Sequence, residues 1–304
     1  MKVVSYLGGI PNARKNPEKA EMLIRFADGV NAAGDIGVVH NSRDLLQADV
    51  GVIQGWVHAN SPDTKHLGLR RQVSQNTHNR HTIIIDSNLF NYTGIKTPAY
   101  HRYSMDGIFP TTGKYFWDNP DPQRWLQIRR DYNISLKDWR HPGKHILICT
   151  QRNGGWSMDG FAVVDWLHNT VQSIKQHTDR PILVRAHPGD KRANEYLQQN
   201  QGNWEISNQP SILDDFERAW CVVTYNSSPG VAAAIEGIPV FVTDPVDGGK
   251  RSQAHPVANT KIKAIEAPQF FERQQWIERI CMSHWNFKEL SNGSAWSHMR
   301  NYIT

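Results

Sequence analysis

Short apolar runs alternate with longer amphipathic or polar stretches through the first half of the chain. After Pro17, apolar residues recur with helical spacing, and the polar stretch from Asp63 to Asn79 predicts a second helix. Strands are predicted at Val3–Leu7, Ile36–His40, Asp49–Val57 and His81–Asp86. Because strand and helix signals alternate, the pattern predicts a parallel sheet with right-handed crossovers.

The second half repeats this alternation after a linker near residues 133–144. Helices are predicted from about Asp159 to His177, at Ile212–Ala219 and after Pro229, and residues 268–304 are helical by pattern. Strands are predicted at His145–Thr150, Ile182–Arg185, Trp204–Ile206, Val222–Tyr225 and Pro239–Thr243. We therefore predict an α/β fold of two doubly wound Rossmann-like domains that face each other across a cleft. The N-terminal domain spans 1–135, and the C-terminal domain spans 145–304 with its terminal helices.

Residues 88–122 interrupt the alternation with many aromatic side chains among Gly, Pro and Asn. A long irregular stretch in a compact domain often faces the substrate or forms a lid. An aromatic cluster that packs the end of the first domain explains the same composition, and the sequence leaves both readings open.

Composition favours a soluble protein with an anionic partner. The net charge is +5 and the pI is near 9.1, which suits nucleotide phosphates, nucleic acid or an anionic glycan. No apolar run reaches the ~18 residues of a spanning helix, and the first apolar stretch is too short for a secretory signal. The three cysteines are scattered, as in a reducing compartment, so a cytoplasmic location is expected.

Polar loops follow two of the predicted strands in the second half. Arg185, His187 and Lys191 follow one strand, where ligands of open parallel sheets bind and where Arg and His hold phosphate oxygens. A capped turn with an ordinary loop histidine is the alternative. The second loop begins with Tyr225 and contains Ser227 and Ser228 before Pro229, where a serine serves as helix cap and its hydroxyl also suits a phosphate.

The two loops together carry a resemblance. Arg-Ala-His-Pro-Gly-Asp at 185–190 and Tyr-Asn-Ser-Ser-Pro-Gly at 225–230, with Glu236 before Gly-Ile-Pro-Val-Phe, resemble the carboxy-terminal domain of GT-B glycosyltransferases. The capsule polysaccharide and Kdo-transferase families and the bacterial sialyltransferases carry such His-Pro and Ser-Ser motifs. The resemblance covers roughly residues 180–245. It implies that His187 and the serines contact the phosphate or nucleotide of a nucleotide-sugar, and that Glu236 contacts the ribose.

Two glycine loops extend the expected donor site. Gly8 and Gly9 after the first strand resemble the glycine-rich loop that approaches the donor in such enzymes, although a tight turn explains them equally well. The corresponding loop of the second domain contains Arg152, Asn153 and Gly154. Arg152 there is placed to neutralise a leaving phosphate, while the glycines let the backbone come close.

Transfer by inversion needs a general base near the acceptor hydroxyl. The candidates in the first domain are Asp86, at the end of a strand, and His101 and Asp106 in the aromatic stretch. A turn cap is the alternative role for Asp86. No spacing typical of a metal site occurs, so we expect neither a structural metal nor a cofactor. The sequence also lacks a P-loop, a Gly-x-Gly-x-x-Gly motif and a Gly-x-Ser-x-Gly elbow.

The leading hypothesis is a metal-independent glycosyltransferase that moves a sugar from a nucleotide-sugar to a hydroxyl. The acceptor is a surface glycan, as in polysaccharide biosynthesis, or a hydroxymethylated base in DNA, which the basic charge and many aromatics would suit. A nucleotide-sugar 2-epimerase of the same fold is a second hypothesis. A non-catalytic module that binds a nucleotide or glycan is a third.

Overall fold

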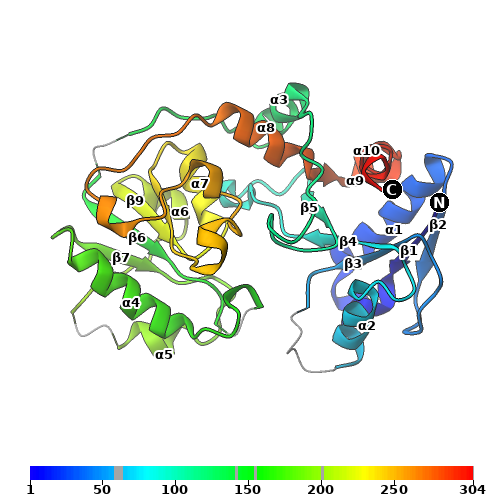
Figure 1. Cartoon of the computed structure of the whole chain (residues 1–304), viewed down its shortest axis with the longest axis horizontal. Helices are drawn as coiled ribbons and strands as arrows, with labels where there is room; N and C mark the ends of the chain where they lie inside the picture. Colours follow the sequence, from blue (N-terminus) through cyan, green and yellow to red (C-terminus); the bar gives the residue numbers. More distant parts are fainter. Residues whose placement is uncertain (58–63, 141–142, 154–155, 200–201, 304) are drawn as a thin grey trace. The chain divides into compact units, whose positions relative to one another are not determined.

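The computed structural model describes residues 1–57, 64–140, 143–153, 156–199 and 202–303. The chain forms two compact units (Figure 1). The first comprises Met1–Asn88, Lys96–Arg124 and Arg279–Thr304, and the second comprises Leu89–Ile95 and Trp125–Glu278. Each is an α/β unit built on one sheet, which confirms the predicted pair of Rossmann-like domains.

The first unit contains a six-stranded sheet in the order β11-β5-β4-β3-β1-β2. Its parallel part consists of β1 (Lys2–Tyr6), β2 (Ile36–His40), β3 (Val50–Gln54) and β4 (His81–Asp86). Two further strands extend it by antiparallel pairing, namely β5 (Tyr100–Met105) and β11 (His284–Asn286). The chain order reverses between β1 and β3, so this pair marks the topological switch point of the sheet.

Helices cover both faces of this sheet. Helix α1 (Pro17–Ala32) shares a core with Val50 and Val52 on one face. Helix α2 (Lys65–Ser74) lies on the other, because a Cβ added to Gly51 would be 2.7 Å from its Val73. The short helices α9 (Phe287–Ser291) and α10 (Ser294–Met299) also pack on α1.

The second unit contains a five-stranded parallel sheet in the order β10-β9-β6-β7-β8. Helices α4 (Val163–Lys175) and α5 (Ala193–Leu197) lie on one face, and α6 (Ile212–Phe216) and α7 (Pro229–Ile235) on the other (Figure 1). Here the chain order reverses between β6 and β9. The strands are β6 (His145–Cys149), β7 (Ile182–Arg185), β8 (Glu205–Ile206), β9 (Ala219–Thr224) and β10 (Val240–Val242).

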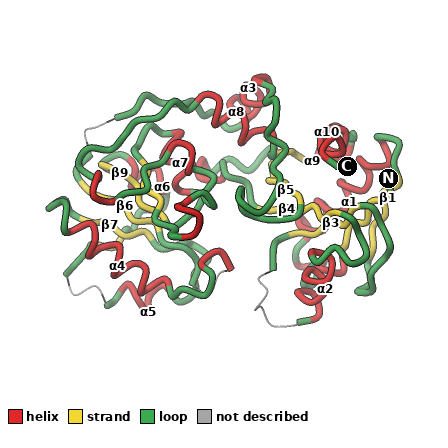
Figure 2. The backbone as a smooth tube through the Cα atoms, in the orientation of Figure 1, coloured by secondary structure: helices red, strands yellow, loops and turns green. Residues whose placement is uncertain are grey.

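Two helices carry the chain between the units, α3 (Pro122–Asp131) and α8 (Gln274–Met282). Between β10 and α8 the chain is mostly loop with short turns of 3-10 helix (Figure 2). Within the described ranges, no helix is both long enough and apolar enough to cross a bilayer.

The division of the chain differs from the predicted one. The C-terminal helices α9 and α10 pack on the first sheet, whereas the sequence pattern placed them in the second domain. The expected linker at 133–144 belongs to the second unit and contacts the end of α7: the Lys137 N–H donates to the carbonyl of Ile235. Gly237 has a φ of +76°, and a Cβ there would be 2.1 Å from the carbonyl oxygen of Asp138. Only glycine permits that contact.

The aromatic stretch 88–122 supplies packing residues to both units. Phe90, Tyr100, Tyr103 and Phe116 are at most 1% exposed. Tyr103 stacks on Phe26 of α1 with ring centroids 6.0 Å apart. The structure therefore supports packing for these side chains, and it also places β5 in a segment that the pattern left irregular.

Candidate functional site

The carboxyl edge of the second sheet collects the polar loops that the sequence singles out. Four parallel strands, β6, β7, β9 and β10, end there. Ligands of open α/β sheets bind at this edge, at the switch point. The loops after β6 and β9 flank that point because these two strands are neighbours.

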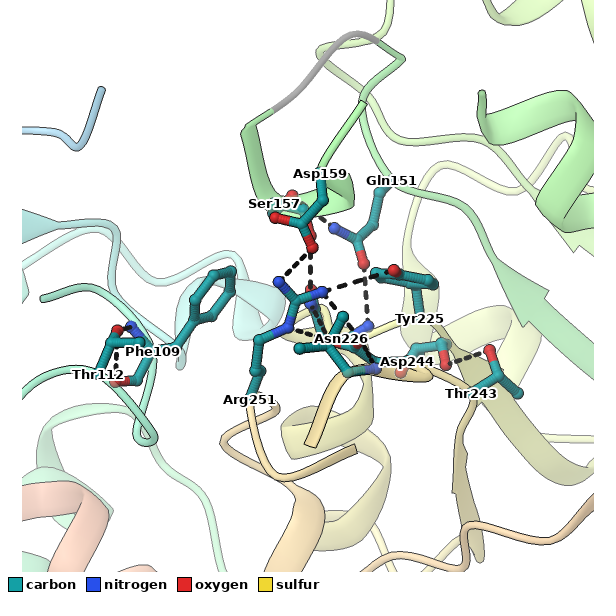
Figure 3. Close-up of polar contacts among 12 residues, drawn as sticks. Phe109, Thr112, Gln151, Ser157, Asp159, Tyr225, Asn226, Thr243, Asp244 and Arg251 are labelled. Carbon is teal, nitrogen blue, oxygen red and sulfur yellow. Dashed lines mark hydrogen bonds and ion pairs between the residues drawn. The ribbon is translucent and has the colours of Figure 1, made fainter. Parts of the chain in front are cut away.

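A hydrogen bond joins the two loops across the switch point. The backbone N–H of Asn226 donates to Oε1 of Gln151 at 2.9 Å, and Gln151 Nε2 donates to Ser157 Oγ at 2.6 Å (Figure 3). Asn226 Nδ2 in turn donates to Asp244 Oδ2 at 2.7 Å, which adds the end of β10. The three loops are thus held together by side chains that the sequence analysis did not single out.

Arg251 is the centre of this network. Its Nε and Nη2 donate to the two oxygens of Asp244 at 2.7 and 2.9 Å, and Nη1 pairs with Asp159 (Figure 3). Nη2 also lies 3.4 Å from the hydroxyl of Tyr225, whose pKa is raised to about 12 by burial. All three nitrogens of a buried guanidinium are therefore directed at acceptors, which fixes the loop after β10. The sequence signal that could have indicated this network is Asp244, an acidic residue that directly follows the predicted strand Pro239–Thr243.

His187 lies in the loop after β7 with a defined tautomer. The backbone N–H of Gly189 donates to its Nδ1 at 2.9 Å, so the neutral ring carries hydrogen on Nε2. Burial lowers the pKa of His187, Asp190 opposes that shift and Arg152 adds to it. Nε2 has no hydrogen-bond partner in the described part of the chain. His187 is therefore prepared to donate one hydrogen bond to a ligand.

The other predicted donor residues of the loops after β6 and β7 differ in availability. Arg152 and Lys191 are exposed and Asn153 is half-buried, while Gly154 lies outside the described residues. Arg185 is already engaged: its Nη1 donates to Asp215 Oδ2 at 2.6 Å and to the carbonyl of Gln209 at 3.0 Å. Because Asp215 is fully buried, Arg185 serves to anchor the loop before α6.

Ser227 and Ser228 stand at the start of α7. Ser228 is the N-cap residue and Pro229 occupies the first turn, as predicted, but neither serine makes a side-chain capping hydrogen bond. Ser228 is exposed, and the hydroxyl of Ser227 is buried without a partner in the described residues. An unused buried hydroxyl at the carboxyl edge is a candidate ligand contact.

Glu236 lies at the opposite end of α7 from the two serines. Its carboxylate pairs with Lys137 and accepts a hydrogen bond from the hydroxyl of Tyr92 at 3.2 Å. A seven-residue helix is about 10 Å long, so Glu236 and Ser228 mark opposite edges of the sheet. The structure therefore does not bring the expected ribose contact together with the expected phosphate contacts.

Of the three candidate bases of the first unit, Asp86 and His101 lie at one end of the β4–β5 pair and Asp106 lies at the other. Asp86 ends β4 and pairs with Arg102, and its Oδ1 accepts from the N–H of Ser87 at 2.8 Å. His101, on β5, is 6% exposed and lies 3.2 Å from Glu18, and burial lowers its pKa. Asp106 lies beyond the far end of β5, next to the start of β4.

Asp106 has a structural role at that edge. It has a φ of +62°, accepts from the N–H of Thr82 at 2.8 Å and lies 2.7 Å from His81 Nδ1. These contacts hold the amino ends of the parallel strands, opposite the edge where ligands bind. The geometry therefore favours Asp86 over Asp106 as a base.

Gly8 and Gly9 make close contacts inside the first unit. A Cβ on Gly8 would be 2.2 Å from the carbonyl oxygen of Ser42, so the loop after β1 packs tightly on the loop after β2. Gly9 is buried and its carbonyl accepts from Arg70 Nε at 2.7 Å. Tight packing thus explains Gly8 without a ligand.

A cavity of about 300 Å³ opens on the α4 face of the second unit. Trp166, Tyr225 and the exposed Phe161 form its apolar wall, and Asp165 and Asn169 lie among its lining residues. Tyr225 belongs to both this cavity and the Arg251 network. Within the described residues, no three His, Cys, Asp or Glu side chains are grouped to hold a metal ion.

Comparison with known proteins identifies the fold. The chain is similar to a solved structure titled Thermosulfurimonas dismutans KpsC, beta Kdo 2,7 transferase, at 14% identity and a TM-score of 0.52, over 97% of this chain and 99% of that one. A second, titled Thermosulfurimonas dismutans KpsC, beta Kdo 2,4 transferase, matches at 12% identity and a TM-score of 0.51, over 94% and 92%. No protein-family model and no curated protein sequence matches. The chain therefore has the GT-B fold of two Rossmann-like domains.

Proposed function

We propose that this protein transfers a sugar from a nucleotide-sugar donor to a hydroxyl acceptor, with the donor bound at the carboxyl edge of the second sheet. One observation carries the proposal: on a GT-B fold, loops with Arg152, His187 and Ser227 all lie at this edge, around the β6–β9 switch point. Helix starts and basic side chains at such an edge suit phosphates.

The spacing of the strands fits the phosphates of a nucleotide. β7 and β9 flank β6 on either side, so the ends of β7 and β9 lie about 10 Å apart. His187 Nε2–H and the Ser227 hydroxyl would bind opposite sides of a phosphate chain of that reach. Arg152, from the loop after the intervening strand, would neutralise the charge that develops on the leaving phosphate.

In the second unit, two side chains are enough to stabilise the leaving phosphate. Charge on the departing phosphate is met by Arg152 and by the Nε2–H of His187, so we propose a reaction without a metal ion. The general base would come from the first unit, where Asp86 has the best position. Its pairing with Arg102 orients the carboxylate.

The acceptor proposed is a glycan hydroxyl, since two solved structures of similar fold are titled Kdo transferases. A nucleic-acid acceptor would instead reveal itself by a steep dependence of acceptor binding on salt.

The test is nucleotide binding followed by transfer. CMP, UDP, GDP and ADP are titrated against the wild-type chain and the His187→Ala variant, with His177→Ala as matched control because His177 is exposed in the same unit. We expect one nucleotide to raise the melting temperature of wild type and control, and to bind His187→Ala roughly tenfold more weakly. Its sugar conjugate should lose sugar to water or acceptor in the presence of EDTA. Equal binding to both variants, or no binding at all, would refute the donor site.

A further inference from the structure

Arg70 lies at the switch point of the first sheet. It is on α2, which follows β3, and it is 8% exposed. Its guanidinium lies beside Gly9, after β1, and Gly55, after β3. β1 and β3 are neighbouring parallel strands between which the chain order reverses. This is where doubly wound sheets bind ligands.

Two glycines make room for the side chain. A Cβ on Gly9 would be 3.3 Å from Arg70 Cγ, and one on Gly55 would be 3.2 Å from Nη1. Gly55 also has a φ of +79°, which disfavours any other residue. Among the described residues, the one hydrogen bond of Arg70 runs from Nε to the carbonyl of Gly9 at 2.7 Å. That bond orients the guanidinium and leaves both terminal nitrogens unused by the described residues.

Other buried arginines differ in this respect. In Arg124, both terminal nitrogens donate to Glu289. In Arg251 they donate to Asp159, Asp244 and a tyrosine hydroxyl. In Arg273 they donate to the carbonyls of Ala234 and Lys137. Arg70 is thus the exception among the buried arginines of the described chain.

Electrostatics reinforce the contrast. Burial lowers the pKa of Arg70 to about 10, and no carboxylate among the described residues offsets that shift. His66, one turn earlier on α2, has its pKa lowered by burial and by the charges of Arg70 and Arg43. Arg70 and Arg43 thus place two positive charges close to His66. A buried, unpaired charge is costly, and such a cost is commonly retained where a ligand supplies the missing partner.

We propose that Arg70 binds an oxyanion, the phosphate or carboxylate of a substrate, at the β1–β3 switch point. Its terminal nitrogens present the planar fork that matches two oxygens of one group. The proposal rests on residues of the first unit alone and does not depend on the sugar-transfer proposal. It assigns a role to Gly9 and Gly55, which hold the guanidinium in place.

The first test observes Arg70 directly. The full chain is labelled with ¹⁵N-arginine, and the Nε–H signal of Arg70 is identified by its loss in Arg70→Met. Inorganic phosphate and acetate are titrated separately at low ionic strength. We expect a saturable shift of this signal with at least one anion, and the better anion identifies the class of oxyanion. The shift should persist in His187→Ala. If neither anion moves the signal, the proposal fails.

The second test separates a binding role from a structural one. Arg70→Met removes an uncompensated charge, so without anion its melting temperature should equal or exceed that of wild type. The anion that shifts the signal should bind Arg70→Met at least tenfold more weakly, and Arg25→Met, which removes an exposed charge of the same unit, should bind normally. Arg70→Lys keeps the charge without the fork and should be intermediate. Destabilised Arg70→Met and Arg70→Lys variants with wild-type anion affinity would overturn the proposal. If the wild-type chain binds no nucleotide but its Arg70 signal still shifts with the anion, only the sugar-transfer proposal is overturned.

Discussion

Arg251 binds both carboxylate oxygens of Asp244 through Nε and Nη2, at 2.7 and 2.9 Å, and both side chains are buried. The pair links the end of β10 to a loop seven residues further on. The Asp244 side chain is fully buried, and Arg251 is its ion-pair partner; Arg251 in turn pairs with both Asp244 and Asp159.

Breaking this pair from one side should be costly. Asp244→Ala leaves a buried guanidinium with one carboxylate, and we expect the free energy of unfolding to fall by about 3–5 kcal/mol. Urea denaturation measures the loss. Asp165→Ala, which removes an exposed carboxylate of α4, should change stability by less than about 0.5 kcal/mol. Equal effects of the two substitutions would contradict a structural role for the network.

Glu236 tests the assignment of the ribose contact. Glu236→Gln weakens the pairing with Lys137 but keeps an acceptor for Tyr92. Lys137 is half-exposed, so the expected loss of stability is only about 1 kcal/mol. Nucleotide affinity, measured by titration, should stay within about twofold of wild type because Glu236 lies at the far end of α7. A large loss of affinity at unchanged stability would restore the ribose role.

His284 predicts how the stability of the chain depends on pH. Burial lowers its pKa to about 3, with Arg102, Arg124 and His101 adding to the shift, so the folded protein keeps the ring neutral. The unfolded chain binds a proton below its ordinary pKa near 6.5. The unfolded state therefore gains protons as pH falls, and this group removes up to about 1.4 kcal/mol of stability per pH unit below 6.5.

The measurement compares how steeply the free energy of unfolding changes with pH in wild type and in a variant without His284. Urea unfolding at several pH values between about 4 and 7 should show a shallower pH dependence for His284→Asn than for wild type, by about one proton. His177→Asn, which changes an exposed histidine, should keep the wild-type slope. Parallel curves for wild type and His284→Asn would contradict the prediction, whatever the absolute stability of the variant.

A substitution at Gly29 tests the packing of the C-terminal helices α9 and α10 on α1. A Cβ at this position would be 1.8 Å from the carbonyl oxygen of Leu290, so α1 and α9 approach through a glycine. Gly29→Ala should cost about 3 kcal/mol by overpacking, although alanine in an isolated helix would be favourable. Thermal unfolding measures the change. Asp28→Ala, on the exposed side of α1, should leave the melting temperature nearly unchanged.

The regular elements were largely predictable from the sequence. Ile36–His40 and His81–Asp86 are strands with the predicted bounds, because a short β-branched run gives a strong local signal both in the buried strand β4 and in the partly exposed edge strand β2. β5 and β11 were missed, since an antiparallel edge depends on pairing with a distant segment. β11 is only three residues long, in a stretch of helical pattern.

The candidate site shows the same limit. His187 and Ser227 follow strands as predicted, since a strand end places its loop at the edge of the sheet. Arg185 illustrates what local reasoning cannot resolve. Its position at a strand end is right for a ligand contact, but its partner Asp215 lies thirty residues away and determines where the side chain points. Arg70 and Arg251 were missed for the same reason, because their roles arise from packing between loops.

The edge strand β11 gives the chain an unusual order of assembly. Domains generally fold as units during synthesis, the N-terminal one first. Here the first sheet lacks β11, and α1 lacks its contacts with α9 and α10, until residues 284–299 have been made. The second unit, whose residues end at Glu278, is complete by then. Synthesis of the first unit therefore starts before that of the second unit and finishes after it.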